Sequence, residues 1–157
     1  NGDGIPELPR AVLMAGYKDT SSSDAVYMLD WYAYGIGKVP TKVATTYQNI
    51  SDAWSLLIDQ KWHDRITAIK VSDGGLSYVE FFEYRKNKMS IPLFNIYCAT
   101  GSNREYYAER TDLIQLGQTT QAIYFAKLTN EGEQSELALT GDEIKARFSL
   151  VNQAWNN

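Results

Sequence analysis

The sequence predicts an α+β fold, mainly a twisted antiparallel β-sheet with a C-terminal helix packed on one face. Three observations support this fold class. Short alternating apolar runs follow one another from Ala11 to about Leu128, turn-forming residues separate them, and the pattern changes to a helical period after Thr140. The 11 Tyr, 4 Trp and 5 Phe also favour strands, because aromatic rings pack well on a pleated surface.

The first hairpin is predicted between residues 25–34 and 39–47. In the first run Tyr27, Leu29, Trp31 and Ala33 share a face that lacks Asp30. The connection Gly35-Ile36-Gly37-Lys38 holds two glycines between two strand-like runs, which is typical of a hairpin turn.

Two further hairpins are predicted downstream. Residues 66–71 and 78–84 flank Ser72-Asp73-Gly74-Gly75, and residues 113–116 and 122–128 flank Gly117-Gln118-Thr119-Thr120. Connections this short make neighbouring strands antiparallel. Residues 93–98 form another predicted strand, with Phe94, Ile96 and Cys98 on its core face, and residues 103–110 are either a short helix or a loop.

The C-terminal helix is predicted over residues 141–155. Thr140 and Glu143 have the spacing of a capping box, in which each side chain binds the other residue's backbone amide. Ile144, Phe148, Val151 and Trp155 follow at helical spacing and form one apolar stripe. At 157 residues the chain has the length of a single domain.

Charge and composition exclude some functions. With 15 Lys and Arg against 19 Asp and Glu, the net charge of −4 argues against a nucleic-acid partner. The basic cluster Arg85-Lys86-Asn87-Lys88 lies between two apolar runs and is predicted to form a solvated turn. No run approaches the ~20 apolar residues of a membrane span. Cys98, the one cysteine, lies in an apolar run and is predicted to be a buried thiol.

No catalytic constellation can be identified from local spacing. His63 and Asp64 are adjacent, so on a strand they would point to opposite faces. A glycoside hydrolase remains an alternative, because its two carboxylates can come from distant strands. Glu80 and Glu83 are predicted to be solvated residues near the end of a strand.

Aromatic side chains are the better candidates for ligand binding. Flat rings beside Asn, Asp and Gln are typical of saccharide-binding surfaces, and the candidates are Trp31, Tyr34, Trp54 and Trp62. The same rings also suit the core of a β-sheet, so each candidate has a structural alternative.

The opening Asn1-Gly2-Asp3-Gly4-Ile5-Pro6-Glu7-Leu8 has the spacing of the second part of a calcium loop. Asn1 and Asp3 would supply side-chain oxygens, Ile5 a carbonyl and Glu7 the closing carboxylate. The first aspartate of such a loop would precede residue 1. Residues 1–10 are therefore predicted to be either the remnant of a preceding calcium-binding repeat or an ordinary polar turn.

This opening resembles the end of FG-GAP/VCBS-type calcium repeats. Residues 31–38, 53–84, 93–97 and 122–127 are similar to strands of exported or lipid-anchored proteins of Gram-positive anaerobes that carry a PsbP-like domain. The resemblance implies a PsbP-like α/β/α sandwich, although this chain shows few helices before Gly141. It also implies export, surface attachment, a non-enzymatic role and calcium at Asn1, Asp3, Ile5 and Glu7.

Together these features predict a non-catalytic extracytoplasmic domain that binds a saccharide, a cell-wall component or a protein partner. The alternatives are a glycoside- or ester-type hydrolase with carboxylates from separate strands, and a structural spacer or assembly domain.

Overall fold

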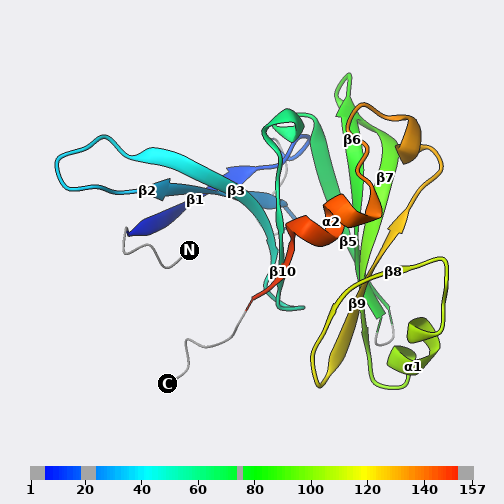
Figure 1. Ribbon diagram of the computed structural model, residues 1–157. Coiled ribbons are helices and arrows are strands. Elements are labelled where there is room, and N and C mark those ends of the chain that lie inside the picture. Colours follow the sequence, from blue (N-terminus) through cyan, green and yellow to red (C-terminus); the bar gives the residue numbers. More distant parts are fainter. Residues whose placement is uncertain (1–5, 19–23, 74–75, 152–157) are drawn as a thin grey trace.

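The computed structural model describes residues 6–18, 24–73 and 76–151, which form two five-stranded antiparallel sheets with little helix (Figure 1). Sheet A has the order β1-β2-β3-β4-β10. Its strands are β1 (Glu7–Leu13), β2 (Tyr27–Ala33), β3 (Thr41–Asn49), β4 (Trp54–Leu57) and β10 (Phe148–Leu150). Residues 7–10, for which the sequence left a repeat remnant or a polar turn open, lie in β1 and pair with β2.

Sheet B has the order β5-β6-β7-β9-β8. Its strands are β5 (Ile66–Asp73), β6 (Leu76–Arg85), β7 (Lys88–Thr100), β8 (Ile114–Gln118) and β9 (Ala122–Leu128). All three predicted hairpins are confirmed, because β2–β3, β5–β6 and β8–β9 are antiparallel neighbours.

The basic segment after β6 is the solvated turn that the sequence predicted. Lys86 and Asn87 are exposed and have φ angles of 48° and 59°, and they join β6 to β7. Two successive positive φ angles are typical of a type I′ hairpin turn, whose twist matches that of the flanking strands.

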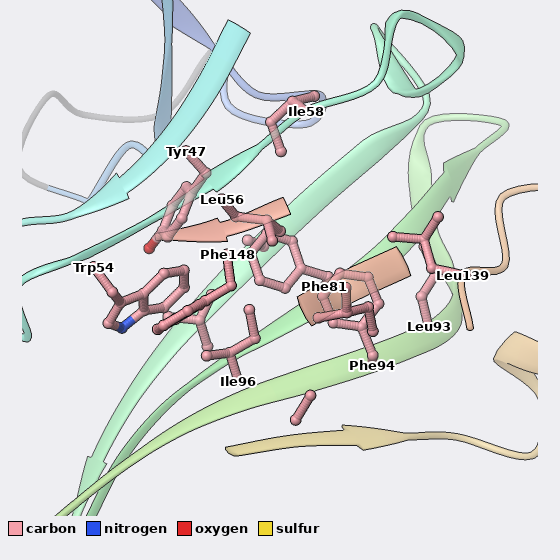
Figure 2. Packing of buried hydrophobic residues seen from close by; sticks show 14 of the residues in the cluster. Tyr47, Trp54, Leu56, Ile58, Phe81, Leu93, Phe94, Ile96, Leu139 and Phe148 are labelled. Carbon is pink, nitrogen blue, oxygen red and sulfur yellow. The ribbon is translucent and has the colours of Figure 1, made fainter. Parts of the chain in front are cut away.

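The prediction of one sheet was wrong, since the strands divide into two sheets that share a hydrophobic core. Tyr47 and Leu56 of sheet A face Phe81, Phe94 and Ile96 of sheet B (Figure 2). The ring centroids of Tyr47 and Phe81 are 5.4 Å apart, and those of Phe81 and Phe94 are 4.8 Å apart. The core face predicted for β7 is confirmed, because Phe94, Ile96 and Cys98 are buried.

The chain passes from sheet A to sheet B through a 3₁₀ turn, η1 (Gln60–Trp62), between β4 and β5. Trp62 is fully buried and its indole N–H donates to the carbonyl of Leu137 at 3.1 Å. A second 3₁₀ turn, η2 (Gly132–Gln134), follows β9. The short helix α1 (Asn103–Ala108) lies against β7 and β9, where Tyr107 packs on Phe125.

The C-terminal helix is shorter than the sequence predicted. α2 (Gly141–Arg147) begins with the predicted capping box, in which the Glu143 N–H donates to Thr140 Oγ1 and the Thr140 N–H donates to Glu143. The chain then becomes extended at Phe148, and β10 pairs with β4. Phe148 is buried against Trp54 and Tyr124, so strand pairing and aromatic packing together end the helix.

α2 lies between the sheets rather than across one outer face, in contact with β4 of sheet A and with β8 and β9 of sheet B (Figure 1). None of the helices in the described ranges is long and apolar enough to cross a lipid bilayer.

Candidate functional site

A groove opens where β4 separates from β3. The two strands pair from Thr46 to Asn49 on β3, and the last contact is the Ile58 N–H donating to the Thr45 carbonyl at 2.8 Å. Beyond it the chain turns away into η1. The space between, which we call the β3–β4 groove, has a volume of about 610 Å³ and is lined by Lys42, Val43, Ala44, Thr45, Leu57, Ile58, Asp59, Gln60, His63 and Arg147.

A one-residue bulge determines which side chains face this groove. Trp31 of β2 pairs with Ala44, whereas the next residue, Tyr32, pairs with Lys42, so Val43 is an extra residue in β3. Without the extra residue, strict alternation would place Lys42 on the opposite side of the sheet from Thr45. With it, Lys42 and Thr45 both lie on the Asp30 side.

Asp30 is the centre of a polar cluster on that side. Its side chain is nearly buried, and Oδ1 accepts hydrogen bonds from Thr45 Oγ1 at 2.6 Å and Lys42 Nζ at 2.9 Å. His63 Nε2 lies 3.0 Å from Lys42 Nζ, 3.1 Å from Thr45 Oγ1 and 3.9 Å from Asp30 Oδ1. The carboxylate, hydroxyl, ammonium and imidazole groups therefore converge beside the groove, which Lys42, Thr45 and His63 line.

This environment keeps Asp30 ionised at neutral pH. Burial by itself raises the pKa of its carboxyl, but the hydrogen bond from Thr45 and the Lys42 ammonium outweigh that effect and hold the pKa below its usual range. Asp30 thus acts as a permanent acceptor that fixes Thr45 and Lys42 in place.

A second ion pair, between Asp59 and Arg147, also lines the groove. Arg147 of α2 donates to Asp59 Oδ2 at 3.0 Å, and Asp59 Oδ1 also accepts the Lys61 N–H of η1 at 3.1 Å. The Lys61 backbone hydrogen bond and the Arg147 guanidinium lower the pKa of Asp59. This pair fastens α2 to the start of η1.

Asp64 takes no part in the cluster, although it and His63 lie in the turn after η1 and not on a strand, where adjacent residues would point to opposite faces. It has a φ angle of 57° and lines a separate pocket with Lys18, Tyr84 and Lys86. The contacts of Asp30 were not predicted, because Thr45, Lys42 and His63 reach it from other elements. The one local signal was an acidic residue inside an apolar strand.

The outer face of sheet A, turned away from the core, adjoins the groove. We define it by the side chains that strand register places together: Glu7, Pro9, Ala11, Leu13, Tyr27, Leu29, Trp31, Ala33, Thr41, Ala44, Thr46, Gln48, Ser55, Leu57 and Ser149. Glu7, at the start of β1, is the one acidic residue among them, and none of them is basic. Tyr27 and Leu57 are 38% and 42% exposed, and the Trp31 indole N–H donates to Thr46 Oγ1 at 2.9 Å. Ala44 and Leu57 also line the groove, so the face and groove are continuous.

The four aromatic candidates separate into two groups. Trp31 lies half-buried on the outer face, and Tyr34 is exposed just after β2. Trp54 and Trp62 are fully buried core residues: Trp54 stacks on Phe148, and Trp62 bonds to Leu137 as described above. Their rings therefore present no face to a ligand in this structure.

The predicted calcium ligands Asn1, Asp3 and Ile5 lie outside the described residues, and the loop stays a prediction. Glu7 is in β1, opposite Ala33. Within the described ranges no three or more His, Cys, Asp or Glu side chains are grouped to hold a metal ion.

The prediction for Glu83 was wrong, because this residue is fully buried rather than solvated. It shares the core-facing parity of Val79 and Phe81, and its carboxylate accepts hydrogen bonds from Arg65 at 3.2 Å, Arg85 at 2.5 Å and Ser135 at 2.6 Å. Burial by itself raises the pKa of Glu83, but the hydrogen bonds from these donors lower it by a larger amount. The pKa of Glu83 therefore lies below its usual range. Through the hydrogen bond from Ser135, the Glu83 carboxylate connects β6 to the segment before α2.

The buried-thiol prediction for Cys98 is confirmed. Burial raises the pKa of Cys98 to about 11, so the thiol is protonated at neutral pH and is a poor nucleophile.

Compared with known proteins, the chain matches no family model, no curated protein and no solved structure.

Proposed function

We propose that this protein is a non-catalytic, extracytoplasmic binding module that holds an uncharged saccharide on the outer face of sheet A. The carrying observation is the chemistry of that face, which combines Trp31 and Tyr27 with Thr46, Gln48 and Ser55 and carries no charge except the Glu7 carboxylate at the start of β1. Aromatic rings pack on the apolar C–H faces of sugars, while hydroxyl and amide groups exchange hydrogen bonds with sugar hydroxyls. A phosphorylated or otherwise anionic ligand would find no positive counter-charge there.

The β3–β4 groove gives the saccharide a polar end to the site. Leu57 and Ala44 lead from the face into the groove, where Gln60, Asp59 and Arg147 carry side-chain donors and acceptors. Specificity for one sugar would come from these groups, because apolar stacking alone discriminates weakly between sugars of similar shape.

The ionisation of the nearby acids supports binding rather than cleavage. Hydrolysis of a glycosidic bond requires a protonated carboxylic acid beside the leaving oxygen, with a raised pKa. Asp30 and Asp59 both have lowered pKa values and are ionised at neutral pH. The hydrolase alternative therefore lacks its proton donor at the groove.

The test is affinity electrophoresis in gels containing soluble, uncharged β-glucan, xylan or mannan. We expect one of them to retard the protein, and Tyr27→Ala to weaken that retardation about tenfold, equivalent to about 1.4 kcal/mol. Tyr106→Ala is the matched control, because Tyr106 is 62% exposed but lies on α1 beside sheet B. Absence of retardation by all three polysaccharides, or an equal effect of Tyr106→Ala, would contradict the proposal.

A further inference from the structure

The tip of the β2–β3 hairpin exposes apolar side chains at the end of a projecting arm. Ile36 is 104% exposed and Val39 is 85% exposed, with Tyr34 at 43% and Val43 at 50%. Figure 1 shows this hairpin extending away from sheet B and from both helices. Exposure of this extent, gathered at one place, usually marks a contact surface.

The turn holds these side chains outward. The Lys38 N–H donates to the Gly35 carbonyl at 3.1 Å and Gly37 has a φ of +70°, as the third residue of a type II turn requires. A Cβ added at Gly37 would meet no atom within 4 Å, so open space surrounds the end of the hairpin. Ile36, the second residue of the turn, therefore stands at the outermost point of a hydrogen-bonded structure.

The charge near the tip differs from that of the whole protein. Residues 31–51 contain Lys38 and Lys42 and no Asp or Glu, although the protein has a net charge of −4. Lys42 is paired with Asp30, whereas Lys38 lies at the tip itself, exposed beside the apolar side chains. An apolar tip with an adjacent ammonium group complements the interface of a bilayer that carries anionic headgroups.

We propose that the β2–β3 tip inserts Ile36 and Val39 into the interfacial region of a lipid bilayer containing anionic lipids, with Lys38 at the headgroups. A protein partner fits the tip less well, because a stable protein interface buries about 800 Å² on each side and a narrow turn with four apolar side chains offers less. Ile36, Lys38 and Val39 belong neither to the outer face of sheet A nor to the lining of the β3–β4 groove, so saccharide binding and membrane contact can be tested separately.

Co-sedimentation with vesicles tests the proposal. The full chain is mixed with phosphatidylcholine vesicles, with or without 30% phosphatidylglycerol as a set composition. We expect sedimentation with the anionic vesicles and at least a fivefold lower bound fraction for Ile36→Asp. Ile50→Asp is the matched control, since Ile50 is 68% exposed in the β3–β4 turn, and it should bind as the unmodified protein does.

The charge is tested by Lys38→Glu, which should lower binding to anionic vesicles at low salt, while Lys88→Glu at the start of β7 should not. Equal thermal melts of all variants would show that they are folded. Absence of sedimentation, or equal binding by the Ile36 and Ile50 variants, would overturn the proposal. So would an Ile36-dependent self-association in sedimentation velocity without vesicle binding, which would assign the tip to protein docking.

Discussion

The extra residue Val43 in β3 determines which side chains meet beside Asp30. By interrupting the alternation of β3 it brings Lys42 to the Asp30 side, where the ammonium lies 2.9 Å from the carboxylate. Replacing Lys42 by Met should therefore raise the pKa of Asp30, because the remaining Thr45 hydrogen bond would have to offset burial with less help. Carbon-13 NMR titration of the Asp side chains measures this, and Lys38→Met on the same hairpin is the control. An unchanged Asp30 titration in Lys42→Met would contradict the assigned role of the ammonium.

The same pair sets a direction for stability against pH. A carboxyl with a pKa lower in the folded than in the unfolded state stabilises the fold above its unfolded pKa, about 3.9 for Asp. That contribution disappears as the pH falls through the folded pKa. The Lys42→Met protein should consequently lose less stability than the unmodified protein when both are taken from pH 5 to pH 2.

At the scale of single residues, the sequence predicted whether a residue is buried better than which residues it contacts. It identified Cys98 as a buried thiol, because an apolar run surrounds it. It could not separate Trp31 from Trp54 and Trp62, since the same ring suits an outer face or a core. Nor did it predict that Asp30, Thr45 and His63 are neighbours, because strand pairing decides which distant segments lie side by side. The bulge also reverses the alternation of side chains on which a sequence argument depends.

Among the elements, α2 was predicted correctly at its start and incorrectly at its end. The capping box is a local signal carried by Thr140 and Glu143, and it forms as expected. Ile144 and Phe148 satisfy a helical spacing, but Phe148, Ser149 and Leu150 also alternate as a strand does. The free edge of β4, which no local pattern in this segment reveals, favours the strand.

The cap provides an element-scale prediction. Thr140→Ala should lower the free energy of unfolding by about 1 kcal/mol, because the Glu143 N–H loses its acceptor. Ser102→Ala is the matched control: Ser102 occupies the same position before α1 but makes no side-chain capping bond, so its loss should be near zero. Urea denaturation measures both values, and equal losses would contradict the importance of the Thr140 bond.

In the whole molecule, the antiparallel strands were predictable, but their division into two sheets was not. Hairpin signals act over a few residues, whereas η1, through which the chain passes between the sheets, holds Trp62 in a contact with Leu137 from far along the sequence. Phe81 of sheet B, which also stacks on Phe94 in its own sheet, then joins the two sheets by contacting Tyr47 of sheet A.

The shared core predicts a single cooperative unfolding transition. Melts followed by far-ultraviolet circular dichroism and by tryptophan fluorescence should coincide, and Phe81→Ala should shift both equally, with a loss of about 3–5 kcal/mol. Tyr106→Ala, at an exposed ring, should shift neither. Two separate transitions, or a Phe81→Ala shift in one signal alone, would mean that the sheets unfold independently.

The pairing of β10 with β4 has a consequence for how the protein is made. Phe148 lies opposite Leu56, so nearly all of sheet B is translated between the two partners. During synthesis on the ribosome, the β4 edge of sheet A stays unpaired until β10 has been translated. Trp54 also lacks its contact with Phe148 until the segment after α2 has emerged. A nascent chain paused before that point would expose apolar surface to chaperones, however well its hairpins had already formed.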